Sequence, residues 1–142
     1  MGDVVHSLSA LERARALWPQ AELWWVVERL AAPLLEGHPA LDGLVVLERK
    51  EATRSAGALR RALGGIGRLR GQRFDAALDL QGLLRSALVA RASGARRVLG
   101  PSWAREGARF LYSDRLPAPR PGESHAVERY LRLVEGAHRT LS

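Results

Sequence analysis

Residues 74–86 read Phe-Asp-Ala-Ala-Leu-Asp-Leu-Gln-Gly-Leu-Leu-Arg-Ser, and this stretch decides the fold class. Residues 74–80 are apolar enough to predict a buried strand. Polar residues close that strand, and a helical pattern then covers 83–91 and stops at a Ser-Gly pair. A buried strand that passes directly into a helix is typical of an α/β protein with a parallel sheet.

The same alternation of strand and helix continues on both sides of this stretch. We expect further strands at 21–27, 43–47 and 97–100, and helices at 4–17, 55–70 and 124–134. Such strands form a parallel sheet with helices on both faces, and ligands bind beyond the carboxyl ends of the strands. The residues that follow each strand are therefore the candidates for a site.

The start of the chain departs from this pattern. Met1 and Gly2 pass at once into a helix, whereas a doubly wound domain normally places a buried strand before its first helix. We therefore expect a sheet without its first, central strand. An isolated domain of this kind is expected to be marginally stable, or to associate through the open position in the sheet.

The length and composition of the chain exclude several classes of protein. The 142 residues suffice for one domain, and the absence of cysteine excludes disulfides and thiolate metal sites. There is no apolar run of about 18 residues, no signal-peptide pattern and no phosphate-binding glycine loop. The four histidines show no metal-ligand spacing, so neither a metal nor another cofactor is expected.

The net charge of +7 comes almost entirely from arginine, since Lys50 is the only lysine. This charge favours anionic partners, although a GC-rich coding sequence would produce the same excess of arginine. A nucleic-acid-binding module is a rival interpretation. Aromatic residues make up only 6% of the chain and no recognition motif is present, so no nucleic-acid partner is expected.

Polar residues at helix starts and strand ends each allow two interpretations. Asp3 could act as a general base or merely cap its helix, and His125 could likewise bind a ligand or cap. Gln81 can donate and accept hydrogen bonds to a ligand, or belong to turn chemistry. The neighbours Glu128 and Arg129 could form an ordinary surface ion pair.

Five segments taken in order carry a family resemblance: Gly-Asp-Val-Val-His-Ser-Leu at 2–8, Trp-Trp-Val-Val-Glu at 24–28, Asp-Leu-Gln-Gly-Leu-Leu-Arg-Ser at 79–86, Ala-Arg-Glu at 104–106 and His-Ala-Val-Glu-Arg at 125–129. Together they resemble the N-terminal half of the lipopolysaccharide heptosyltransferases of glycosyltransferase family 9. The type I enzymes are the most similar. The resemblance covers nearly the whole chain.

The resemblance implies a two-domain enzyme with two Rossmann-like halves, in which the N-terminal half binds the Kdo-bearing lipid A acceptor and the C-terminal half binds the donor ADP-heptose. It implies inverting transfer without a metal, with Asp3 as the base. It also implies acceptor-binding roles for Lys50, Arg54, Gln81, Arg105 and Arg129. The location would be cytoplasmic, peripheral at the inner membrane.

Residues 1–142 would then be a truncated acceptor-binding domain without the nucleotide-sugar domain. We expect such a fragment to be inactive by itself, because nothing in it would hold the leaving diphosphate. A type II or III heptosyltransferase, or a non-catalytic remnant, are the alternatives within the family.

Overall fold

The computed structural model describes residues 2–47 and 56–142. In chain order the helices and strands are α1 (Gly2–Leu17), β1 (Trp24–Glu28), the 3-10 helix η1 (Arg29–Leu34), β2 (Gly43–Leu47), α2 (Ala56–Gln72), β3 (Ala76–Leu78), α3 (Leu84–Ala92), β4 (Arg97–Pro101), the 3-10 helix η3 (Ala108–Leu111), β5 (Asp114–Leu116) and α4 (Ala126–Leu141). The predicted α/β class, with its parallel strands and helices, is confirmed.

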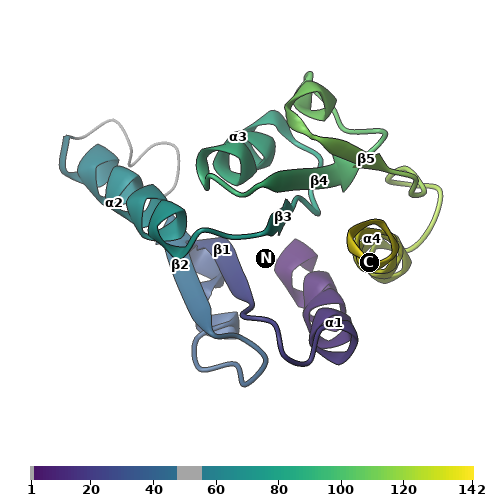
Figure 1. Cartoon of the computed structure of the whole chain (residues 1–142), viewed down its shortest axis with the longest axis horizontal. Coiled ribbons are helices and arrows are strands. Elements are labelled where there is room, and N and C mark those ends of the chain that lie inside the picture. The colour runs from purple at the N-terminus through teal and green to yellow at the C-terminus, as the bar shows by residue number, and fades with distance from the viewer. Residues whose placement is uncertain (1, 48–55) are drawn as a thin grey trace.

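The described strands form two parallel sheets rather than one (Figure 1). β1 pairs with β2 over five residues, whereas β3, β4 and β5 pair in that order. The sequence predicted a parallel sheet short of a central strand. In the described part of the chain no strand-to-strand pairing joins β1 to β3, so the strands divide into two sheets.

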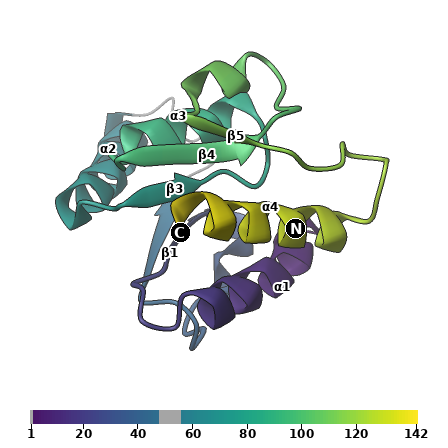
Figure 2. The ribbon, with the colours of Figure 1, turned by 45° about the vertical axis from the view of Figure 1, so that its right-hand side comes forward.

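Two layers of helices cover the sheet of β3, β4 and β5 (Figures 1 and 2). α3 and η3 pack on one face through a core that includes Ala87, Val98 and Tyr112. α4 packs on the other face, where Leu99 and Leu133 are fully buried. α1 lies alongside α4. The strands of this sheet are therefore sandwiched between apolar helix faces, as parallel strands require.

The prediction for the last helix was wrong at its C-terminal end. The sequence suggested that Gly136 stops the helix near residue 134, but α4 continues to Leu141. Gly136 is buried, and a Cβ atom built there would lie 3.9 Å from the Leu116 side chain. That is an ordinary contact distance, so a glycine is not required there. The helix continues through Gly136 because Ala137 and Leu141 beyond it pack in the same core as Leu116.

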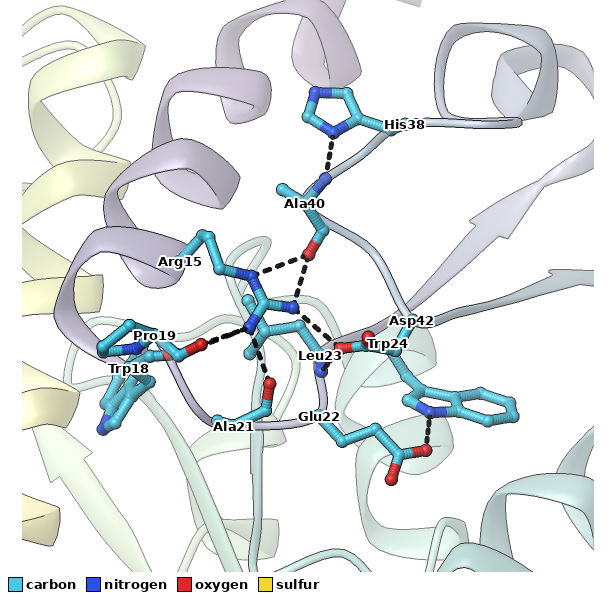
Figure 3. Close-up of polar contacts among 10 residues, drawn as sticks. All are labelled: Arg15, Trp18, Pro19, Ala21, Glu22, Leu23, Trp24, His38, Ala40 and Asp42. Atoms are coloured by element: carbon cyan, nitrogen blue, oxygen red, sulfur yellow. Dashed lines mark hydrogen bonds and ion pairs between the residues drawn. The ribbon is translucent and has the colours of Figure 1, made fainter.

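Arg15, near the end of α1, ties that helix to the loops before β1 and β2 (Figure 3). Its guanidinium donates to the carbonyl of Ala21 at 2.7 Å and to the carbonyl of Ala40 at 2.8 Å. It also contacts Asp42 at 2.7 Å, and Asp42 in turn accepts the amide of Leu23 at 2.8 Å. The backbone hydrogen bond from Leu23 and then the Arg15 guanidinium lower the pKa of Asp42.

Candidate functional site

The turn after β3 is organised by Asp79, which is buried at 4% exposure. Its carboxylate accepts the backbone amides of Gln81 and Gly82 at 3.0 and 3.4 Å and the hydroxyl of Tyr112 at 2.5 Å. A polar residue at the end of an apolar strand is not expected in the core from its sequence position alone, yet Asp79 is buried there. Its partners make burial tolerable, because a buried carboxylate needs hydrogen-bond donors.

Tyr112 belongs to the same buried arrangement. Burial, and next the hydrogen bond to Asp79, raise the pKa of the Tyr112 phenol well above its usual range. A Cβ atom at Gly100, on β4, would overlap the Tyr112 ring, so only glycine leaves room for the ring at this place on the strand. The phenol therefore stays protonated and serves as a fixed donor to Asp79.

Gly82 connects this turn to the next strand end. Its φ of +69° lies in the left-handed region, and a Cβ atom there would lie 2.8 Å from the Trp103 ring. Its carbonyl accepts the amide of Arg105 at 2.8 Å. The turns after β3 and β4 are thus bonded to each other, with the Trp103 ring lying against Gly82.

An open pocket of about 210 Å³ lies at these carboxyl ends of the strands. The eight lining residues come from the turns after β3 and β4, from the segment before α4 and from its first turn: Leu80, Gln81, Leu83, Trp103, Arg105, Pro121, Arg129 and Tyr130. None of these eight carries a carboxylate, and two carry a guanidinium. The lining thus combines positive charge with apolar and aromatic walls.

Two polar atoms of this lining are buried without a hydrogen-bond partner. They are Nε1 of Trp103 and Nε of Arg129; Oγ of Ser124, just before α4, is a third such atom. Arg129 is held in place by another of its nitrogens, which donates to the Ser124 carbonyl at 3.0 Å. Buried donors are normally satisfied, so these atoms mark a place where a ligand with oxygen acceptors would complete the bonding.

The start of α1 is brought to the same region. The ring of His6 contacts the ring of His125 edge-on, with centroids 5.2 Å apart. His125 accepts the amide of Val127 at 3.2 Å and so caps α4, which makes the capping interpretation of this residue the correct one. The first turn of α1, where Asp3 lies, therefore stands beside the first turn of α4, which carries Arg129.

The structure brings together three of the six residues that the sequence singled out. Gln81, Arg105 and Arg129 line the pocket. The backbone of Asp3 belongs to the first turn of α1, while Lys50 and Arg54 lie outside the described residues.

Sequence reasoning missed Trp103 and Tyr130 as lining residues. The position of Trp103, two residues before Arg105 in the turn after a strand, was the available signal. The suggested ion pair between Glu128 and Arg129 was wrong, because Glu128 pairs with Arg132 at 2.9 Å.

Neither a metal cluster nor a membrane-spanning helix is found among the described residues. Among them, no group of three or more acidic, histidine or cysteine side chains could hold a metal ion. None of their helices combines the length and apolarity that a membrane span requires.

The sequence of residues 62–140 matches the family model for glycosyltransferase family 9 (heptosyltransferase), which is more than half of the chain. The chain belongs to glycosyltransferase family 9. Lipopolysaccharide heptosyltransferase 1 of Escherichia coli (strain K12) is 33% identical over 134 residues, which are 91% of this chain and 42% of that protein. Its counterpart in Pseudomonas aeruginosa is 34% identical over 146 residues, covering 96% and 40% respectively.

A solved structure of a family 9 enzyme has the same fold. It is described as E. coli heptosyltransferase WaaC with ADP, and it superimposes with a TM-score of 0.82 at 30% identity, over 94% of this chain and 43% of that chain. The resemblance to family 9 inferred from the motifs is thereby confirmed. The chain spans about two fifths of the length of these relatives.

Proposed function

We propose that this chain is the acceptor-binding half of a lipopolysaccharide heptosyltransferase and that the pocket at the carboxyl ends of β3 and β4 holds an anionic sugar of the acceptor. The observation that carries the proposal is the lining itself. Arg105 and Arg129 supply positive charge, and buried donor atoms of Trp103 and Arg129 have no partner. Carboxylates and phosphates are the groups that guanidinium forks bind best.

The acceptor we propose is the Kdo-bearing core of lipid A, as the family resemblance implies. A Kdo sugar presents a carboxylate together with several hydroxyl groups. The carboxylate would pair with Arg105 or Arg129, while the amide of Gln81 can donate to one hydroxyl and accept from another. Lys50 and Arg54 would add positive charge for the phosphates of the acceptor.

In the proposed reaction Asp3 acts as the general base. Its carboxylate would remove the proton of an acceptor hydroxyl as that oxygen attacks the anomeric carbon of heptose, and ADP would leave with the electrons of the broken bond. The backbone of Asp3 belongs to the first turn of α1, and the positive end of a helix dipole is in general a place where a base can be held ionised. The donor ADP-heptose would bind a second domain, and the chain alone would not transfer heptose.

The proposed site of action is the cytoplasmic face of the inner membrane. The net charge of +7 supports it, since an anionic membrane surface attracts arginine-rich proteins without a spanning segment. Transfer would then take place where the lipid-linked acceptor presents its sugars.

Binding of a deacylated, water-soluble Kdo-bearing core to the chain tests the proposal, measured by calorimetry. We expect 1:1 binding that Arg129→Gln weakens about tenfold, the loss typical of one charge-assisted hydrogen bond. Arg132→Gln is the matched control, because Arg132 lies one turn further along α4, is exposed and pairs with Glu128. Equal loss in both variants, or no binding, would overturn the proposed role of the pocket.

Two further measurements separate the parts of the proposal. Asp3→Asn should change acceptor affinity less than Arg129→Gln does, because a base contacts a neutral hydroxyl rather than the acceptor's charge. The chain incubated with ADP-heptose and acceptor should release no ADP. Heptose transfer by this chain would contradict the proposed inactivity.

A further inference from the structure

We infer that the opposite end of the sheet carries a second anion site, which binds a small phosphate-bearing group. Arg70, Arg73 and Arg96 surround a hollow of about 230 Å³ whose other lining residues are Phe74 and Gly94. This site is separate from the pocket of the proposed function and does not depend on it. The two can therefore be tested independently.

The strand order places this hollow at the amino ends of β3 and β4. Phe74 precedes β3 (Ala76–Leu78) and Arg96 precedes β4 (Arg97–Pro101), whereas the pocket with Gln81 follows both strands. Figure 2 shows β4 running from the side of α2 toward the side on which α4 begins. The hollow and the pocket therefore lie at opposite ends of β3 and β4, so a ligand bound at one end does not occupy the other.

The backbone fixes the three arginines relative to one another. The amide of Arg96 donates to the carbonyl of Phe74 at 3.2 Å, and the amide of Arg73 donates to the carbonyl of Arg70 at 3.3 Å. Gly94, with φ of +76°, lets the chain turn beneath Arg70, whose side chain lies 3.6 Å from where a Cβ atom would stand. The hollow is therefore built from two adjoining turns rather than from one flexible loop.

Arg73 directly follows α2 and adopts a φ of +54°, in the left-handed region, as does Glu106 among the described residues. A residue with a side chain pays about 1 kcal/mol or more there, a cost that glycine avoids. Arg73 keeps its side chain at this position and lines the hollow. Retained strain of this kind is a reason to look for a binding role.

The charges of the three side chains are not neutralised within the described chain. Arg70 donates one N–H to the carbonyl of Ala92 at 3.0 Å, while the guanidinium groups of Arg73 and Arg96 make no hydrogen bond or ion pair with another described residue. Asp75, which follows Phe74 and is exposed, forms no ion pair with any of the three. Three like charges around one hollow favour an anion between them.

The size and walls of the hollow set the class of ligand. At about 230 Å³ it is smaller than the roughly 300–1,000 Å³ typical of sites for drug-sized molecules. A phosphate or diphosphate group fits this volume and matches the forked donors of arginine. Phe74 forms a fixed wall, because its ring contacts Trp24 edge-on with centroids 5.7 Å apart.

Calorimetric titration of the chain with inorganic diphosphate, at constant ionic strength, tests the inference. We expect saturable binding with a component that Arg96→Gln weakens about tenfold, that Arg73→Gly weakens similarly although glycine suits the local backbone, and that Arg129→Gln in the other pocket leaves unchanged. Arg132→Gln, which removes the same charge from α4, should bind as the parent chain does. Circular dichroism establishes that each variant is folded.

The source of the phosphate is settled by a second arm with vesicles that contain a phosphomonoester lipid, compared with vesicles of neutral lipid only. Binding to soluble diphosphate that Arg96→Gln weakens indicates a free phosphate ligand. Binding to phosphomonoester vesicles alone, again lost in Arg96→Gln, indicates a lipid headgroup. Absence of saturable binding in both arms, or equal weakening by Arg132→Gln, would overturn the site.

Discussion

Replacing Tyr112 by phenylalanine is expected to destabilise the chain through the one hydrogen bond that it removes. The hydroxyl donates to buried Asp79 at 2.5 Å, and Asp79 also organises the amides of Gln81 and Gly82. The variant keeps the ring against Gly100 and the apolar core. The change therefore isolates the polar contact from the packing.

The size of the expected stability loss follows from the hydrogen bond between Tyr112 and the Asp79 carboxylate. A hydrogen bond to a charged group contributes about 1.5–3 kcal/mol, and the upper half applies here because Asp79 is only 4% exposed and loses one of three donors. For a domain of this size the same loss corresponds to a fall in Tm of about 5–10 °C. The turn that carries Gln81 should loosen at the same time.

Urea unfolding followed by circular dichroism measures the effect, with Tyr112→Phe, Asp79→Asn and the double variant forming a cycle. We expect a coupling energy of about 1 kcal/mol or more between the two positions. A loss below about 0.5 kcal/mol in Tyr112→Phe, or additive effects in the double variant, would show that the hydrogen bond does not stabilise the fold as argued.

Two further predictions concern the turn after β3 that contains Gly82 and the loss of folding stability at low pH. Gly82→Ala should lower the free energy of unfolding by about 1–3 kcal/mol, because the φ of Gly82 is +69° and the added methyl group would meet the Trp103 ring. Urea unfolding measures this loss, and the tryptophan emission spectrum should change with it. Unchanged stability would contradict the prediction. The pKa of Asp42 is lowered by the Leu23 amide and Arg15, and that of Asp114 by Arg97. Both carboxylates therefore stabilise the fold above their unfolded pKa, near 3.8, and this stability is lost as the pH falls through their lower folded values. Asp42→Asn should flatten the fall in Tm below pH 4, and an identical pH profile would count against the network around Arg15.

The sequence predicted the elements whose apolar pattern is strong. The strand at 43–47 coincides with β2, and the helices at 55–70 and 83–91 agree with α2 and α3 to within two residues at each end. β5 was not predicted, because Asp114–Leu116 is three residues long and carries two charges. It owes its place to pairing with β4 and to Leu116 packing under α4, neither of which a local pattern can reveal.

Some residues of the candidate site were also predictable from the sequence, and others were not. Gln81, Arg105 and Arg129 were found because motifs with a family resemblance contain them, and their meeting around one pocket follows from the parallel strand order. Trp103 and Tyr130 were missed because an aromatic residue in a loop or helix is usually explained by packing. The burial of Asp79 depends on Tyr112, 33 residues away, so sequence spacing gave no indication of it.

The division of the strands into two sheets has a consequence for how the chain opens in solution. β1 and β2 pair with each other through backbone hydrogen bonds. Among the described residues neither strand pairs with β3, β4 or β5. Hydrogen exchange should therefore resolve two cooperative units, with the β1–β2 pair opening at a lower free energy than the sheet that α3 and α4 enclose. The pocket residues after β3 and β4 would then belong to the more protected unit, so the pocket would stay formed when the β1–β2 pair opens.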